Sequence, residues 1–557
     1  MATLIPQTPM KILWLDLNSS YAHSSLALPA LQAQLTGHTQ IEWDIVSATI
    51  NENPGMTSAE ICRRRPDIVA ATCWLFNHEP LLHTLARIKA LLPSCRIVLG
   101  GPEFLGDNET FLRNYPFVDC VFRGEGEETF AQWTAVWNKP EQWHTTKGLC
   151  YLDTHQAYHD NGRAQVADIQ HLVPPEESPF FNWSKPFVQL ETTRGCFNTC
   201  AFCVSGGEKP VRTLSIETIR KRIGIIREHH IHNIRVLDRT FNYNSRHAKA
   251  LLDLFREFPD IRFHLEIHPA LLTDELKEEI ASMPAGQLHL EAGIQSLHQE
   301  VLDRSRRNGK LEDALAGLKF LCALPNVETH ADLIAGLPLY HLGQIFDDVR
   351  ILASYGAGEI QLETLKLLPG TEMRRRAEEL GICYSPFPPY EVLQTHEITP
   401  DELQTARMLS RLLDGFYNAK VWQAVTRKLI VEQPDFLHRF LDHLIHIGVI
   451  DQPMSQERRG ILLYDFCRNT YPAYETAVTL AWIEAGMSLK KQPAARIRTK
   501  HVLPPEHWEI IYGTYHEGLR LCLLPPAEGE STAYWFGFET ESQQAKPVFK
   551  AVQKEQA

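Results

Sequence analysis

The chain has 557 residues, of which 44% are hydrophobic, and a formal net charge of −13 at pH 7. This length exceeds what one hydrophobic core supports, so the sequence predicts two to four domains. The negative charge argues against a general nucleic-acid or anionic-membrane binder, although Arg304, Arg306, Arg307 and Lys310 form a local basic group. No run reaches the roughly 20 apolar residues that span a bilayer, and residues 1–9 lack the features of a signal peptide. We therefore expect a cytoplasmic protein with no nucleic-acid partner and no membrane insertion.

The N-terminal third alternates between strand-like and helix-like segments. Strand-like runs occupy residues 11–17, 43–50, 67–74, 96–99 and 119–122, and helical patterns occupy 26–35, 59–64, 80–92, 108–114 and 127–137. Such alternation predicts a doubly wound, parallel α/β sheet over residues 1–150. Ligands of these sheets bind beyond the carboxyl ends of the strands. The three most distinctive loops, residues 18–23, 100–103 and 123–127, follow strands there.

Two glycines, Gly100 and Gly101, open the second of these loops and allow two interpretations. A turn can require the positive φ that glycine adopts without strain. Alternatively, the missing side chains let the backbone approach a bulky ligand. The two glycines alone do not decide between these interpretations.

The next segment, residues 151–185, is predicted to be a linker. A small hairpin is expected at 148–160, and a Pro-rich connector at 171–183 marks a domain boundary. Beyond it, a β-compatible run at 188–192 is broken by Arg194 and Gly195.

The loop that follows carries Cys196, Cys200 and Cys203 in C-x3-C-x2-C spacing. A loop of this length can wrap three thiolates around one face of an iron–sulfur cluster. Four cysteines normally hold such a cluster, so three leave one iron open for reaction. Structural zinc is the alternative, but it needs four ligands, and no fourth cysteine or histidine follows at a matching interval. The other nine cysteines lie singly, mostly in apolar contexts, as buried free thiols do.

Strands and helices alternate again after the cysteine loop. Predicted strands are 188–192, 234–238, 263–267, 287–293, 327–335 and 359–365, with helices at 216–229, 248–258, 273–282, 312–324 and 341–355. In barrels built from such βα repeats, chemistry gathers at the carboxyl ends of the strands. Polar residues lie at those ends: Asp238, Asn242, Glu266, His268, Glu291, Gln295, Asp332 and Lys366. Each of them taken alone is explained as well by a turn, a helix cap or exposure to solvent.

The C-terminal region, residues 391–557, is predicted to be mostly helical. Residues 400–492 carry apolar stripes such as Leu403, Ala406 and Leu409, which indicate packing faces. Residues 508–515, 519–524 and 533–540 resemble short strands, and the polar segment 541–557 is expected to be loose.

The cysteine triad after a strand, with the aromatic Phe202 before its last cysteine, resembles the radical SAM superfamily. Segments 265–269, 291–296 and 332–338 resemble three successive strand motifs of that family, and the N-terminal loops resemble its cobalamin-binding branch. The resemblance implies a partial, TIM-like (β/α)6 barrel over residues 186–390, followed by an uncharacterised helical domain. It also implies three cofactors: a 4Fe–4S cluster, S-adenosylmethionine and cobalamin.

The resemblance assigns roles to several barrel residues. Glu266 and Asp332 are assigned to the ribose of S-adenosylmethionine, and Gln295 to its adenosyl part. Glu291 begins the motif that contains Gln295. Arg307 is expected to face the methionine carboxylate, with its neighbour Arg306 as the rival assignment.

The cobalamin contacts that the resemblance implies are Asn18, Tyr21, Gly100, Gly101, Gly124 and Glu125. Asn18 stands where many cobalamin domains place a histidine that binds cobalt. The lone His23 is interpreted as a hydrogen-bonding residue. We therefore expect cobalamin without a protein histidine on its cobalt.

The function implied is a radical methylation. S-adenosylmethionine is cleaved to a 5′-deoxyadenosyl radical, and a methyl group passes to an unactivated carbon of an unknown small molecule or peptide. A low-potential donor of flavodoxin or ferredoxin type is expected to supply the electron. Ring closure or oxidative rearrangement with the same cofactors, and sensing of cobalamin or S-adenosylmethionine without turnover, are the alternatives. A methylthiotransferase would need three further N-terminal ligands, and Cys62, Cys73 and Cys95 lack ligand spacing.

Overall fold

A computed structural model describes residues 9–21, 25–494, 497–498, 508–539 and 546–554. The chain forms two compact units. The first comprises Met1–Thr329, Ile334–His341 and Thr364–Leu403, and the second comprises His330–Leu333, Leu342–Glu363 and Gln404–Ala557.

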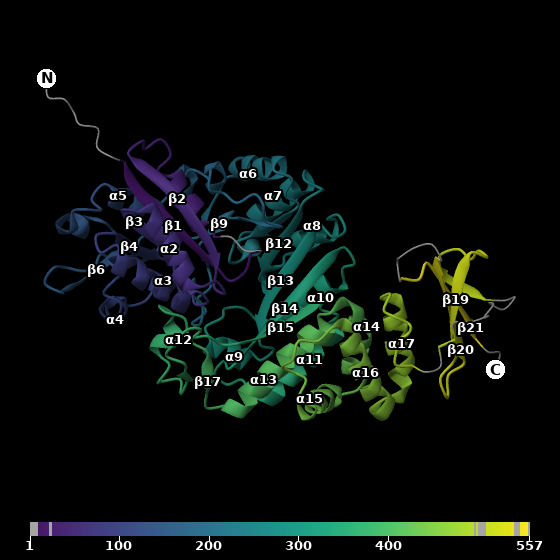
Figure 1. The fold of residues 1–557 in the computed structure, drawn as a ribbon. Helices are drawn as coiled ribbons and strands as arrows, with labels where there is room; N and C mark the ends of the chain where they lie inside the picture. The colour runs from purple at the N-terminus through teal and green to yellow at the C-terminus, as the bar shows by residue number, and fades with distance from the viewer. Residues whose placement is uncertain (1–8, 22–24, 495–496, 499–507, 540–545, 555–557) are drawn as a thin grey trace, which may run out of the picture. The chain divides into compact units, whose positions relative to one another are not determined.

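The first unit begins with a seven-stranded sheet in the order β2-β1-β3-β4-β5-β6-β7 (Figure 1). Its strands are β1 Met10–Asn18, β2 Ile41–Thr49, β3 Ile68–Thr72, β4 Arg96–Gly100, β5 Cys120–Phe122, β6 Leu149–Leu152 and β7 Tyr158–Asp160. Strands β1 to β5 are parallel, whereas β6 and β7 join the edge antiparallel. The hairpin predicted at 148–160 therefore extends this sheet.

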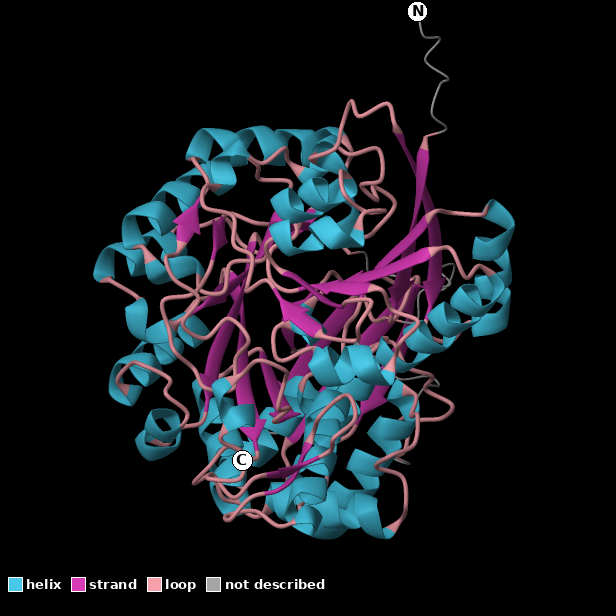
Figure 2. Cartoon of the chain, turned by 90° about the vertical axis from the view of Figure 1, so that its left-hand side faces the viewer, coloured by secondary structure: helices cyan, strands magenta, loops and turns pink. Residues whose placement is uncertain are grey.

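Helices cover both faces of this sheet, since a separate core packs on each face. Figure 2 shows the strands of the chain lying among helices. The helices are α1 Ala27–Ala33, α2 Pro54–Arg64, α3 His78–Leu91, α4 Glu109–Asn114 and α5 Glu127–Thr134. Alternate residues of β1 enter two separate cores: Leu13 and Leu15 pack with α2 and α3, while Ile12 and Trp14 pack on the α5 side. This two-sided burial is why β1 is apolar throughout, and it confirms the doubly wound sheet.

The second sheet has six strands in the order β15-β14-β13-β12-β11-β8, and it confirms the partial barrel. The strands are β8 Val188–Leu190, β11 Asn233–Val236, β12 Arg262–Ile267, β13 Leu288–Gln295, β14 Val327–Ala335 and β15 Glu359–Thr364. The helices between them are α6 Ile216–Glu228, α7 Ser245–Arg256, α8 Asp274–Ala281, α9 Gln299–Arg304, α10 Leu311–Ala323 and α11 Leu342–Tyr355. Ser215, Asn244 and Thr273 cap α6, α7 and α8 with their side chains, which fixes where each helix begins. The short α9 was not predicted.

The second unit is helical, as predicted, and ends in a small sheet. Its helices include α14 Lys420–Glu432, α15 Phe436–His446, α16 Gln456–Thr470 and α17 Glu475–Glu484, preceded by α13 Pro400–Leu412. Four antiparallel strands follow in the order β18-β21-β20-β19: β18 Glu509–Tyr512, β21 Phe549–Lys554, β20 Thr532–Glu539 and β19 Leu519–Leu524. The expectation of a loose tail is wrong for β21, because its alternate residues Phe549 and Ala551 are fully buried.

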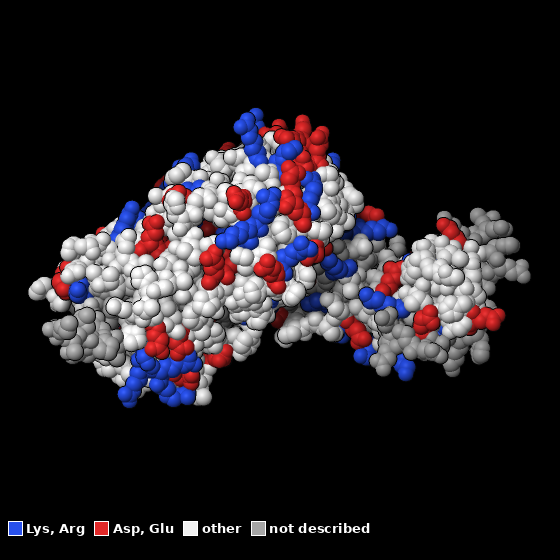
Figure 3. Space-filling view, turned by 90° about the horizontal axis from the view of Figure 1, so that it is seen from above, with Lys and Arg blue, Asp and Glu red and all other residues white. Residues whose placement is uncertain are grey.

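The surface visible in Figure 3 mixes acidic and basic side chains in small groups. Many of these charges are paired, as Arg220 and Glu257 are at 2.7 Å. Within the part of the chain that the structure describes, no helix is long and apolar enough to cross a membrane.

The connector before the barrel is held by a buried ion pair. Glu176, whose side chain has no solvent exposure, lies in the 3₁₀ turn Pro175–Glu177. Its two carboxylate oxygens accept hydrogen bonds of 3.0 and 2.8 Å from Nε and Nη2 of Arg222 on α6. Arg222 also donates to the backbone oxygen of Glu191, immediately before the cysteine loop. The connector is therefore docked against the barrel at a charged contact.

Replacing Glu176 by Gln should destabilise the first unit strongly. The change leaves the buried Arg222 without a counter-charge, and breaking a buried pair in this way costs about 3–5 kcal/mol. Glu257→Gln is the matched control. It breaks the exposed pair between Glu257 and Arg220, which is also bidentate and in which the arginine again lies on α6. Urea unfolding of the cofactor-free protein measures both variants. Equal midpoints for the two would contradict a stabilising role for the buried pair.

Candidate functional site

The start of the cysteine loop is fixed by Asp238, which follows β11. Its side chain is fully buried and accepts hydrogen bonds of 2.8 Å from the backbone N–H groups of Thr192 and Thr193. The Thr192 hydroxyl donates to its second oxygen. Burial raises the pKa of Asp238 to about 6, although these hydrogen bonds oppose the rise. Asp238 therefore stabilises the turn after β8. A structural role in a turn is one of the interpretations that the sequence left open for this residue.

The cysteine loop is closed at its base by a small antiparallel ladder. Thr193–Arg194 forms β9 and pairs with Arg212–Thr213, which forms β10. Cys200 is buried, while Cys196 and Cys203 are partly exposed. Burial raises the pKa of the Cys200 and Cys203 thiols, and the nearby Cys196 thiol adds to the rise for both. The three thiols are thus near enough to influence one another electrostatically.

The tip of the loop is held by backbone contacts to two later segments. The N–H of Ala201 donates to the Ser305 oxygen at 2.9 Å, and the N–H of Met373 donates to the Ala201 oxygen at 2.8 Å. Asn198 accepts a hydrogen bond of 3.0 Å from the N–H of Asn308. These contacts position Cys200 from both sides.

Two of the residues assigned to S-adenosylmethionine lie at this site. Glu266, at the end of β12, is near enough for its charge to act on the Cys203 thiol. Gln295 ends β13 with a φ of +73°, and a Cβ placed on Gly293 would lie 2.5 Å from its amide nitrogen. The carboxylate of Glu291 is occupied by His264, whose Nε2 lies 2.8 Å away.

Other polar residues at strand ends have different surroundings. Asp332 lies in the part of β14 that groups with the second unit, where its Oδ1 is 2.9 Å from Nε2 of His330. Asn242 exchanges two hydrogen bonds with the backbone of His268, at 2.8 and 2.9 Å.

The structure separates the two rival arginines. Arg306 forms an ion pair with Glu372, and its side chain is 48% exposed. Arg307 instead points toward the cysteine loop, and its Nη1 lies 3.7 Å from the Sγ of Cys200. Of the two, only Arg307 contacts a cysteine of the triad within the described residues.

A cavity of about 470 Å³ lies between the cysteine loop and the carboxyl edge of the first sheet. Four residues of the predicted cobalamin set line it: Gly100, Gly101, Gly124 and Glu125. Asn18 and Tyr21 are not part of the lining. The Asn18 amide donates to Asp16 at 2.8 Å, and Tyr21 is 75% exposed, with its hydroxyl 3.2 Å from Glu52. His23 lies outside the described residues.

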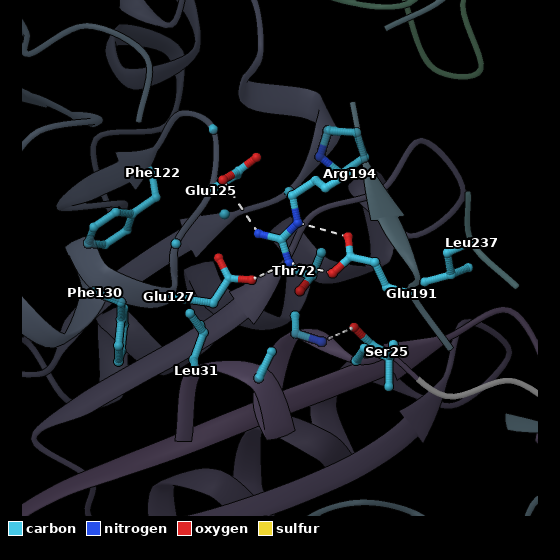
Figure 4. A pocket seen from close by; sticks show the side chains of 18 of the residues that line it. Ser25, Leu31, Thr72, Phe122, Glu125, Glu127, Phe130, Glu191, Arg194 and Leu237 are labelled. Carbon is cyan, nitrogen blue, oxygen red and sulfur yellow. Dashed lines mark hydrogen bonds and ion pairs between the residues drawn. The ribbon is translucent and has the colours of Figure 1, made fainter. Parts of the chain in front are cut away.

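The inner part of the cavity extends along the sheet face that α1 and α5 cover. Small side chains, including Ala30 and Ala70, leave room there, and Leu31, Phe122 and Phe130 form apolar walls (Figure 4). The space is therefore suited to a flat apolar group with a polar group at the mouth.

Arg194 dominates the polar mouth, where three carboxylates converge on it (Figure 4). Glu191 accepts from its Nε and Nη2 at 2.8 and 2.7 Å, Glu127 lies 2.9 Å from Nη2, and Glu125 lies 3.4 Å from Nη1. Burial alone lowers the pKa of Arg194, but the three carboxylates outweigh burial and raise it. The sequence interpretation missed Arg194, Glu127 and Glu191, because the cluster joins two segments, 125–127 and 191–194, that lie more than 60 residues apart in the chain.

Glu125 serves mainly as a partner of arginine. Its carboxylate accepts hydrogen bonds of 2.6 and 2.9 Å from Arg212 and one of 2.6 Å from the N–H of Val166. Burial acts to raise the pKa of Glu125, but Arg212 and Arg194 outweigh it and hold the pKa below its usual range.

The glycines of the cavity divide into two kinds. Gly101 has a φ of +111°, and a Cβ there would lie 2.7 Å from the Cys73 oxygen. A Cβ on Gly124 would collide with the backbone of Ala164. Gly100 has neither constraint, since its Cβ would meet only the Phe122 Cβ at 3.9 Å. Packing thus explains why Gly101 and Gly124 are glycines. It does not require a glycine at position 100.

Comparison with known families identifies three segments. Residues 190–349 match the radical SAM superfamily, residues 15–133 match the B12 binding domain, and residues 378–481 match a protein family of unknown function, DUF4080.

Curated relatives include several methyltransferases. An uncharacterized methyltransferase of Pyrococcus horikoshii is 29% identical over 195 residues, which is 33% of this chain and 42% of the relative. The 2-(S-pantetheinyl)-carbapenam-3-carboxylate methyltransferase of Streptantibioticus cattleyicolor is 24% identical, over 62% of this chain and 53% of its own. The cobalamin-dependent radical SAM methyltransferase TokK of Streptomyces tokunonensis is 22% identical over the same shares. The chain thus spans about half the length of these relatives.

Solved structures share the fold. The cobalamin-dependent S-adenosylmethionine radical enzyme OxsB aligns with a TM-score of 0.60 at 16% identity, over 83% of this chain and 75% of its own. The radical S-adenosylmethionine methyltransferase TsrM from Kitasatospora setae aligns with a TM-score of 0.56 at 14% identity, over 79% of this chain and 96% of its own. The chain therefore contains a B12-binding domain followed by a radical SAM domain.

Proposed function

We propose that the protein is a cobalamin-dependent radical SAM enzyme that methylates an unactivated carbon of its substrate. One observation carries the proposal: the loop with the three cysteines and the strand ends of the B12-binding domain line the same cavity. A 4Fe–4S cluster would supply one electron to cleave S-adenosylmethionine into methionine and a 5′-deoxyadenosyl radical, and cobalamin would supply a transferable methyl group. The chain's own part is to bind and orient these groups and to exclude water.

The cysteine loop has the donor set for the cluster. The three thiols are near enough to influence one another electrostatically. Three cysteine ligands would leave one iron of a 4Fe–4S cubane without a protein ligand. Glu266, Gln295 and Arg307 surround this loop, which supports their assignment to S-adenosylmethionine; Glu291 and Asp332 enter the same proposal on the resemblance alone.

The cavity has the shape and lining for cobalamin. Its apolar inner part would receive the flat base of the nucleotide tail, and Gly100 would let the backbone approach the ligand. Among the described residues that line the cavity there is no histidine, which supports cobalamin without a protein ligand on cobalt. Gly101, Gly124 and Glu125 line the cavity and would act there in this proposal, whereas Asn18 and Tyr21 enter it on the resemblance alone.

We also propose a cytoplasmic location and a low-potential electron donor of flavodoxin or ferredoxin type. The open cluster implied by the triad needs an electron from such a donor. The many unpaired cysteines support a reducing compartment.

Single replacement of Cys196, Cys200 or Cys203 by Ala should abolish both the reducible cluster and the cleavage of S-adenosylmethionine. Two thiols are too few to hold the cluster, because such clusters normally take four cysteine ligands and the triad already supplies only three. Anaerobic reconstitution, followed by iron analysis and chromatography of 5′-deoxyadenosine, measures both effects. Cys383→Ala is the control, since that thiol is exposed and apart from the triad. Cleavage activity retained by any triad variant would refute the assignment.

Gly100→Ala and Gly101→Ala should separate ligand binding from packing. Gly100→Ala adds a methyl group at the cavity without strain, so it should weaken cobalamin binding several-fold while leaving the unfolding midpoint unchanged. Gly101→Ala forces a left-handed residue against the Cys73 backbone, so it should destabilise the fold by about 1–3 kcal/mol. Cobalamin titration and thermal unfolding give the two readouts. Unchanged affinity in Gly100→Ala would mean that cobalamin does not approach this backbone.

A further inference from the structure

Arg307 makes two contacts that together hold its guanidinium in one orientation. Nη2 donates a hydrogen bond to the backbone oxygen of Gly293 on β13, and Nη1 lies 3.7 Å from Cys200 Sγ, within hydrogen-bond distance for sulfur. A planar guanidinium can make both contacts from adjacent nitrogens, which a lysine ammonium cannot reproduce with the same geometry. The arginine is therefore aimed at one sulfur of the triad.

The surrounding backbone leads Arg307 to this position. Arg306 adopts a φ of +55°, so the chain turns between the two arginines and sends their side chains in different directions. A Cβ on Gly293 would stand 3.6 Å from Nη2 of Arg307 and closer still to the Gln295 amide. The glycine thus keeps the β13 carbonyl accessible to the guanidinium.

The positive charge of Arg307 is not neutralised by a neighbour. Within the described residues its guanidinium pairs with no carboxylate, whereas Arg306 is paired with Glu372. Burial lowers the pKa of the His268 imidazole to about 4, and the positive charge of Arg307 adds to this lowering. Cys200 is only 7% exposed, so water screens the contact between Arg307 and its sulfur poorly.

Hydrogen bonds and positive charge at the sulfur ligands of an iron–sulfur cluster favour the reduced state, which carries one more negative charge. We propose that Arg307 is a positioning and tuning residue for the cluster: it donates to Cys200 Sγ and raises the reduction potential of the centre before S-adenosylmethionine binds. The inference rests on the proposed function only in requiring a cluster on the three cysteines. It differs from the carboxylate-binding role, which acts only once S-adenosylmethionine is present.

The test is a redox titration of the reconstituted cluster without S-adenosylmethionine, followed by electron paramagnetic resonance. Arg307→Gln removes the charge and should shift the midpoint potential to a more negative value. Arg307→Lys keeps the charge but loses the fixed fork, so its shift should be smaller and in the same direction. Arg306→Gln is the matched control and should leave the potential unchanged, because that side chain is directed to Glu372.

Each outcome bears on the proposal. An unchanged potential in Arg307→Gln, with reduced affinity for S-adenosylmethionine, would overturn it in favour of carboxylate binding. Loss of the cluster from both Arg307 variants in folded protein, judged by circular dichroism and iron content, would also overturn it, because Arg307 would then be needed for assembly. The proposed methylation is judged separately, by whether the unaltered protein cleaves S-adenosylmethionine and transfers a methyl group.

Discussion

The buried guanidinium of Arg194 is the interaction on which the architecture of the site depends. A charge with little exposure to water is tolerated only when it is paired and hydrogen-bonded. Arg194 finds its partners in two segments: residues 125–127, where the loop after β5 leads into α5, and Glu191 at the end of β8. Because it stands two residues before Cys196, the same interaction fixes the B12-binding domain against the first residue of the triad. A shift of the loop after β5 relative to the peptide around Arg194 would leave two or more charges unpaired.

A second brace acts from the opposite side of the same peptide. Asp238 binds the backbone of Thr192 and Thr193, immediately before Arg194, and its shielded carboxylate makes that bend rigid. The loop that follows is thus anchored by a charge cluster on one side and by backbone hydrogen bonds on the other.

The order of strands and the cysteine triad could be predicted from the sequence, because both are local patterns: periodicity of apolar residues and a fixed spacing. Glu125 shows where such reasoning fails. Its loop was correctly placed at a strand end, but its partner Arg212 lies 87 residues away, and no local signal reveals that pairing. The pairing of Arg194 with Glu125 and Glu127 likewise leaves no local signal, so the sequence indicates only a break in a strand at this residue. β21 was missed because Val552 beside Ala551 breaks the apolar–polar alternation, and the segment becomes a strand through its pairing with β18 and β20.

The position of the cavity follows from the topology of both sheets. Parallel α/β sheets gather their ligands beyond the carboxyl ends of their strands. Here the ends of β4 and β5, with Gly100 and Gly124, and the ends of β8 and β11, with Glu191 and Leu237, contribute to one lining. The carboxyl ends of the two sheets therefore face one cavity, whose lining includes the flanks of the cysteine loop at Arg194 and Ser205. The Arg194 cluster lies at that junction, so the residue that links the cysteine loop to the loop after β5 also forms part of the cavity wall (Figure 4).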